Sequence, residues 1–206
     1  MNPWRAYVSG ALVLIGFGLA IDYFSLDKSN AIIWLSDRRH PAIDHLLYYL
    51  TRLGEWPAFV VIGLIYWYQS WRKMLAIPLI GVVVPIFSQS LKRVFRHERP
   101  LLYFQQEGWE MPAAVLDYHI YTGHHSFPSG HSTAAWALFT LVAAIERKYW
   151  TSALCLVLAA SVSVSRVYLM AHFLRDVLAG AILGFVLGYA VYIAYDRWIK
   201  SPTVSI

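Results

Sequence analysis

The segment HSFPSGHSTAAW, residues 125–136, places a histidine directly after a Pro-Ser-Gly turn and at the start of an apolar run. The first N–H groups of a helix have no partner inside the helix, and the helix dipole favours an anion beside them. A glycine at Gly130 lets a ligand approach the backbone closely. Ser129, Gly130 and His131 are therefore predicted to form half of a phosphate-binding site.

A second histidine has a carboxylate at helical spacing. His172 and Asp176 are four residues apart at the start of the last apolar run, so they share one face of a helix. A carboxylate at one ring nitrogen fixes the histidine tautomer and leaves the other nitrogen free to attack phosphorus. His131 can protonate the leaving oxygen. The sequence thus predicts a nucleophile, an orienting group and a general acid.

Three cations, on Lys92, Arg99 and Arg166, lie near the ends of apolar runs. Neighbouring cations repel unless an anion lies among them, and guanidinium and ammonium groups bind phosphate oxygens well. We expect these three side chains to bind a phosphoryl group together with Ser129 and Gly130. Taken singly, each could instead be a long side chain that extends to lipid headgroups.

The composition indicates a membrane protein. Of 206 residues, 58% are hydrophobic and only 14% are charged, whereas soluble domains carry roughly 25% charged residues. We expect an all-α fold in one membrane-embedded domain, residues 1–206, with six transmembrane helices and short interfacial helices. The first run could be a signal peptide, although an uncleaved span is favoured. The expected spans cover residues 6–24, 56–71, 74–91, 131–146, 150–166 and 173–195.

Six spans would bring the polar segments 25–55, 92–130 and 166–172 to one side of the membrane. Every candidate site residue lies in or beside these segments, which predicts an active site at the outer membrane–water boundary. The short segments on the other side are dense in lysine and arginine, as cytoplasmic loops are. We therefore expect a bacterial inner (cytoplasmic) membrane protein whose site faces the periplasm or exterior.

Three motifs follow one another along the chain: K-x6-R-P in Lys92–Pro100, P-S-G-H in Pro128–His131, and S-R-x5-H-x3-D in Ser165–Asp176. Together they resemble the type 2 phosphatidic acid phosphatase family, in its small bacterial membrane form, over residues 30–195. The resemblance implies a metal-independent lipid phosphatase that needs no cofactor.

The same resemblance implies individual roles. His172 would attack phosphorus to give a phosphohistidine, Asp176 would be its relay partner, and His131 would protonate the leaving group. The groups expected to bind phosphate are Lys92, Arg99, Ser129, Gly130 and Arg166.

Members of this family act on several lipids, so the resemblance leaves the substrate open. Undecaprenyl pyrophosphate is the favoured prediction, because that carrier is recycled at the outer face. Phosphatidylglycerol phosphate and lipid A phosphate are alternatives, the latter including phosphate transfer. An anionic-lipid transporter that uses the same cations is the alternative from another class. Besides the lipid phosphate and membrane lipids, we expect neither a nucleic acid nor an obligatory protein partner.

Two further features carry weaker predictions. His125 precedes the turn and is a candidate substrate contact. Histidines and a carboxylate suit zinc, but the surrounding cations argue against a zinc site made of His124, His125, His131 and Asp176. The small residues Gly180, Gly184 and Gly188 recur every four positions, which predicts close helix packing within the bundle.

Overall fold

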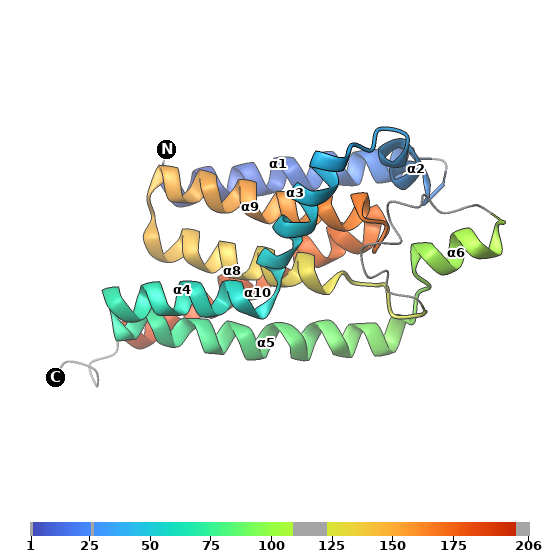
Figure 1. The fold of residues 1–206 in the computed structure, drawn as a ribbon. Helices are drawn as coiled ribbons and strands as arrows, with labels where there is room; N and C mark the ends of the chain where they lie inside the picture. Colours follow the sequence, from blue (N-terminus) through green and yellow to red (C-terminus); the bar gives the residue numbers. More distant parts are fainter. Residues whose placement is uncertain (1, 26, 109–122, 201–206) are drawn as a thin grey trace.

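The computed structural model describes residues 2–25, 27–108 and 123–200, and every regular element within these ranges is helical (Figure 1). The all-α prediction is therefore confirmed for this part of the chain. The elements are α1 (Pro3–Phe24), α2 (Asn30–Ser36), α3 (Pro41–Thr51), the 3₁₀ turn η1 (Arg52–Gly54), α4 (Trp56–Gln69), α5 (Trp71–Phe95), α6 (Pro100–Gln106), α8 (Gly130–Glu146), α9 (Tyr149–Tyr168) and α10 (Leu174–Ile199).

All six apolar runs form helices, but they differ in length. Helices α1, α5, α9 and α10 are long and apolar enough to cross a membrane. Helix α4 has 14 residues and α8 has 17, so at about 1.5 Å per residue both are shorter than a hydrocarbon core of about 30 Å. Length and composition thus identify four candidate spans where the sequence predicts six.

Helix α8 lies at the centre of the bundle, with twelve of its 17 residues buried. Helix α10 packs along it through the three glycines. A Cβ at Gly180 would lie 2.6 Å from the Ser129 carbonyl oxygen, and Cβ atoms at Gly184 and Gly188 would meet the carbonyls of Thr133 and Ala137. The predicted role of this glycine face, packing within the bundle, is confirmed.

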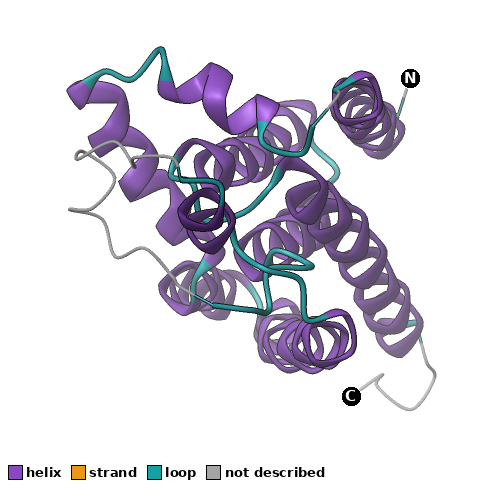
Figure 2. Ribbon diagram, turned by 90° about the vertical axis from the view of Figure 1, so that its right-hand side faces the viewer, coloured by secondary structure: helices purple, strands orange, loops and turns teal. Residues whose placement is uncertain are grey.

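The polar motifs meet at one end of the bundle. The end of α5, the start of α8 and the corner between α9 and α10 all lie at the right of Figure 1, whereas α1 begins and α10 ends at the left. Figure 2 looks onto this end and shows loops crossing the ends of the helices. Residues 109–122 of the predicted outer segment lie outside the described residues.

Helix α3 crosses the bundle beside this end and is fixed to α9 by buried polar contacts (Figure 1). The Tyr168 hydroxyl donates to Asp44 Oδ1 at 2.5 Å, and Arg39 Nη2 lies 3.3 Å from the same oxygen. Arg39 Nη1 also donates to the Tyr168 carbonyl at 2.9 Å. A buried carboxylate is stable only with such partners. They hold the chain from α3 into η1 against the site.

Candidate active site

His172 and Asp176 are linked through a serine hydroxyl. The distance from His172 Nδ1 to Asp176 Oδ2 is 3.8 Å, which is too long for a hydrogen bond. Ser126 Oγ lies 3.1 Å from that nitrogen and 2.6 Å from that carboxylate oxygen. Because the hydroxyl donates its hydrogen to the carboxylate, its oxygen accepts from His172 Nδ1–H. The His172 proton is thereby placed on Nδ1, which leaves the Nε2 lone pair for attack.

The relay is enclosed by protein. Ser126 and Asp176 are fully buried, and His172 is 2% exposed. Asp176 Oδ2 also accepts the Phe173 backbone N–H at 3.1 Å, and the Asp176 carbonyl accepts the Ser129 N–H at 2.9 Å. The starts of α8 and α10 are therefore joined at the relay itself. The sequence predicts the His172–Asp176 pair but gives no sign of Ser126, which is 46 and 50 residues away from them.

Electrostatics favour a neutral His172. Burial lowers the pKa of its imidazole well below the ordinary value of 6.5, and the charges of Arg166, Arg99 and Lys92 lower it further. A neutral imidazole is the form that can act as a nucleophile. The three cations predicted to bind phosphate, Lys92, Arg99 and Arg166, therefore lie close enough to His172 to affect its pKa.

Each of the two arginines is anchored beside this histidine. Arg166, in the last turn of α9 and 4% exposed, donates from Nη1 to Thr51 Oγ1 at 2.9 Å. Arg99 donates from Nη1 to the carbonyl of Ala171, the residue before His172, at 3.2 Å. Directed hydrogen bonds of this kind orient a guanidinium group, and an oriented group is suited to bind an oxyanion.

The start of α8 has unused polar groups. Ser129 precedes the helix without a side-chain capping bond. The hydroxyls of Ser129 and Ser88 are buried and have no hydrogen-bond partner within the described ranges. A Cβ at Gly130 would lie 3.6 Å from Ser88 Oγ and 3.9 Å from Lys92 Nζ. Buried hydroxyls of this kind are costly unless a ligand binds them, and phosphate oxygens would accept from both. Ser88 has no motif to identify it in the sequence.

His131, at the start of α8, contacts an acidic residue, Glu55, that belongs to none of the three sequence motifs. Its Nε2 lies 3.1 Å from Glu55 Oε1. The adjacent Gly54 packs so closely that a Cβ there would be 2.6 Å from the His131 carbonyl oxygen. Glu55 is 76 residues from His131, so no spacing rule could connect them.

His125 holds the loop before α8 against α5. Its Nδ1–H donates to the Lys92 carbonyl at 2.9 Å. The neighbouring His124 forms an isolated backbone bridge with Glu98. His125 is exposed beside the site, and its contact with substrate stays a prediction. Within the described residues no group of three histidine, cysteine or acidic side chains is arranged to hold a metal ion.

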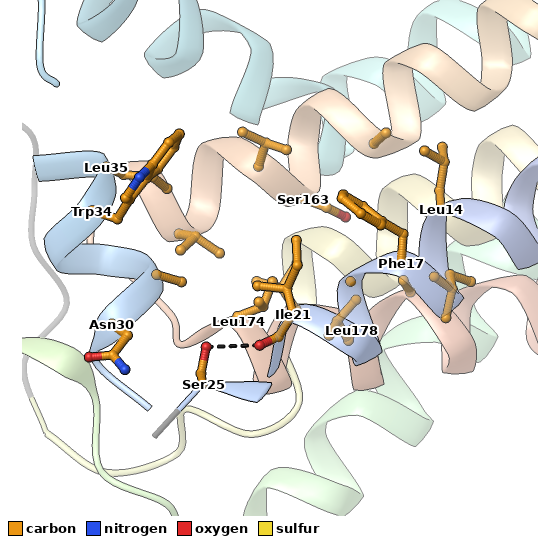
Figure 3. A pocket seen from close by; sticks show the side chains of 18 of the residues that line it. Leu14, Phe17, Ile21, Ser25, Asn30, Trp34, Leu35, Ser163, Leu174 and Leu178 are labelled. Carbon is orange, nitrogen blue, oxygen red and sulfur yellow. Dashed lines mark hydrogen bonds between the residues drawn. The ribbon is translucent and has the colours of Figure 1, made fainter. Parts of the chain in front are cut away.

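An apolar cavity lies on another side of the α9–α10 corner (Figure 3). Its volume is about 620 Å³, within the range of about 300–1,000 Å³ typical of ligand pockets. Helices α1, α2, α9 and α10 supply most of its wall, and Ser25, Asn30 and Ser163 are its polar members. No phosphate-site residue lines it, but Leu174 and Val177 belong to the turn of α10 that carries Asp176.

The helical bundle and this site define a class of protein: one with helices long enough to cross a membrane and, at one end, the histidines, carboxylate and cations that phosphoryl transfer requires. The family model for the PAP2 superfamily matches residues 70–200. The chain therefore belongs to the PAP2 superfamily, and the resemblance drawn from the three motifs is confirmed.

Individual relatives support this assignment at low identity. The chain is 25% identical to a lipid A 4'-phosphatase of Porphyromonas gingivalis over 191 residues, which cover 87% of this chain and 79% of that one. It is 28% identical to phosphatidylglycerophosphatase B of Bacillus subtilis over 177 residues, covering 79% of each. A solved structure, a transmembrane PAP2-type phosphatidylglycerolphosphate phosphatase from Bacillus subtilis, has a TM-score of 0.62 and 25% identity over 95% of this chain and 98% of that one.

Proposed function

We propose that this PAP2 phosphatase hydrolyses a lipid phosphate or diphosphate without a metal ion, through a phosphohistidine on His172. One observation carries the proposal: the Ser126–Asp176 relay leaves Nε2 of a neutral, buried His172 available among three cations. Cations and helix N–H groups stabilise the negative charge of a transferring phosphoryl group.

The reaction has two balanced steps. In the first, the Nε2 lone pair of His172 forms a bond to the terminal phosphorus while the bond from that phosphorus to the leaving oxygen breaks, and this oxygen takes a proton from His131. The leaving oxygen belongs to the lipid alcohol in a monoester and to the lipid monophosphate in a diphosphate. In the second, water attacks the phosphohistidine, gives its proton to His131 and releases inorganic phosphate. Both histidines return to their starting states, and Asp176 with Ser126 fixes His172 throughout.

Undecaprenyl diphosphate is the substrate that we propose first. The proposed six-span topology would place the site at the outer boundary of a bacterial inner membrane, where this carrier is recycled. A diphosphate also presents more negative charge to the three cations than a monoester does. The names of the relatives make phosphatidylglycerophosphate and lipid A 4'-phosphate the substrates to compare with it.

The apolar cavity supports a lipid substrate. We place one hydrocarbon chain of the lipid between α1 and the α9–α10 pair, where the wall is almost wholly apolar (Figure 3). Several lining residues are also open to the surroundings, with Phe17 67% and Trp34 57% exposed. A chain could therefore enter from the bilayer rather than from water.

The test is phosphate release by the purified protein in detergent, with EDTA present. Undecaprenyl diphosphate, phosphatidylglycerophosphate, phosphatidic acid and lipid A would be supplied in parallel. We expect cleavage of undecaprenyl diphosphate at the highest kcat/KM and no cleavage by His172→Ala. Full activity in that variant would overturn the histidine mechanism. Activity that requires added metal would overturn the metal-free mechanism.

A further inference from the structure

The structure pairs His131 with a carboxylate from a different part of the chain. Glu55 Oε1 accepts from His131 Nε2 at 3.1 Å, and the two side chains are 37% and 20% exposed. Glu55 precedes α4 but makes no side-chain capping bond to that helix. Its side chain is therefore directed to His131 and not to the first N–H groups of α4.

The backbone around Glu55 is built against the site. Thr51, four residues earlier, binds Arg166. The buried Gly54 packs against the His131 backbone so closely that a Cβ would lie 2.6 Å from the His131 carbonyl oxygen. The short segment Thr51–Glu55 thus contacts the phosphate-binding and proton-donating sides of the site. Packing on both sides therefore fixes the backbone position from which the Glu55 side chain extends to His131.

The negative charge of Glu55 would affect the protonation of His131. A general acid must carry a proton when the leaving oxygen needs it. The surroundings of His131 disfavour its protonated form, whereas a carboxylate in contact favours that form. Burial disfavours the protonated form most, and the positive charges of Arg166 from α9, Lys92 from α5 and Arg99 before α6 disfavour it further. The neighbouring His172, itself held neutral, would oppose it only if charged.

We infer that Glu55 is the positioning residue of the general acid: it holds His131 Nε2–H and stabilises the imidazolium, so that Nδ1 carries the proton given to the leaving oxygen. The inference rests on the proposed function of this site. It gives the site two carboxylate–histidine units, one for the nucleophile through Ser126 and one, in direct contact, for the acid.

Substrates whose leaving groups differ in basicity distinguish a role of Glu55 in general acid catalysis from a purely structural role. Nitrophenolate leaves readily without a proton, whereas an alkoxide does not. Glu55→Gln should therefore lower kcat on hexyl phosphate about 10- to 100-fold. On p-nitrophenyl phosphate the loss should stay within a few-fold. The basic limb of the kcat–pH profile on hexyl phosphate should move to lower pH by about one unit, because the carboxylate no longer favours the imidazolium. Glu55→Asp should restore part of both effects.

A double-mutant cycle provides the second criterion. In a His131→Ala background, Glu55→Gln should change kcat on neither substrate, because the group through which it acts is gone. Equal losses on both phosphates, or an undiminished loss in the His131→Ala background, would overturn the inference while the phosphatase function stands. A wild-type protein that releases phosphate neither from these two compounds nor from the four lipids named above would instead contradict the proposed function, and the inference with it. Thermal unfolding of each variant in detergent identifies any that does not fold, in which case Glu55→Asp carries the test.

Discussion

The Ser126 hydroxyl donates a 2.6 Å hydrogen bond to Asp176 Oδ2, across 50 residues of chain. His172 reaches that carboxylate only through this hydroxyl, because its own Nδ1 is 3.8 Å away. The serine is therefore the middle member of the relay, and its hydrogen determines which nitrogen of His172 is free.

Replacing this serine tests the relay. Ser126→Ala should lower kcat about 10- to 100-fold, because a charge-assisted hydrogen bond contributes about 1.5–3 kcal/mol and each 1.36 kcal/mol is tenfold in rate. Ser152→Ala is the control, since Ser152 is also buried but lies near the start of α9, away from the site. Phosphate release by both variants is the measurement. Wild-type kcat in Ser126→Ala would show that Asp176 does not act through Ser126.

The pH dependence of the reaction should report the cations around His172. Burial, and after it these cations, hold the pKa of His172 well below 6.5, so the wild-type nucleophile stays neutral as the pH falls through that value. Lys92→Met removes one positive charge, which raises the pKa of His172 toward its ordinary value. The acid limb of kcat/KM should then lie at higher pH in the variant.

Comparing the pH profiles of wild type and Lys92→Met separates titration of the enzyme from titration of the substrate. The substrate phosphate titrates identically with both proteins, with a second pKa of about 6, so a difference in the limb belongs to the protein. Lys148→Met is the control, because Lys148 is exposed at the opposite end, between α8 and α9. Coincident acid limbs in wild type and Lys92→Met would contradict the electrostatic account of His172.

The features that the sequence predicts correctly are those that depend on neighbouring residues. Apolar runs long enough to fold as helices identified all six long elements, because hydropathy is a property of neighbouring residues. The spacing of His172 and Asp176 correctly predicts that they are neighbours, but the shared helix face is wrong: His172 precedes α10, and the turn that begins this helix brings the two side chains to 3.8 Å. The six-span topology stays a prediction, because α4 and α8 have only 14 and 17 residues. An apolar run that is buried in a bundle, as α8 is, has the same composition as one that contacts lipid, so hydropathy alone does not distinguish the two.

The site residues that belong to no sequence motif have partners far away in the chain. In the sequence Ser126 is an ordinary loop serine, and only the fold brings it to His172. Glu55 is a residue before a helix, and only the fold brings it to His131. Ser88 becomes notable only because α5 passes Gly130. Such contacts depend on how helices are packed, and neither spacing nor residue type encodes that packing locally.

Close helix contact beneath the site makes Gly180 sensitive to substitution. The Cβ of Gly180→Ala would lie 2.6 Å from the Ser129 carbonyl oxygen, which is backbone and cannot move aside easily. We expect a loss of stability of about 1–3 kcal/mol and reduced kcat, because Ser129 begins the phosphate-binding turn. Gly16→Ala is the matched control, since nothing lies within 4 Å of its Cβ. Thermal unfolding and phosphate release should separate the two variants, and equal behaviour would contradict the tight α8–α10 contact.

The cavity makes a prediction about chain length. Ala160 lines it, whereas Val157, one turn away on α9, does not and is 59% exposed. Ala160→Phe should fill part of the 620 Å³ and raise KM for long-chain lipid phosphates severalfold, because about 0.8 kcal/mol is lost for each CH₂ that can no longer be buried. KM for hexyl phosphate should change little. Val157→Phe adds the same ring on the outside of the helix and should leave both values near wild type. If Ala160→Phe raised KM equally for short and long chains, the cavity would not hold the hydrocarbon chain of the substrate, and the chain would have to lie against another face of the bundle.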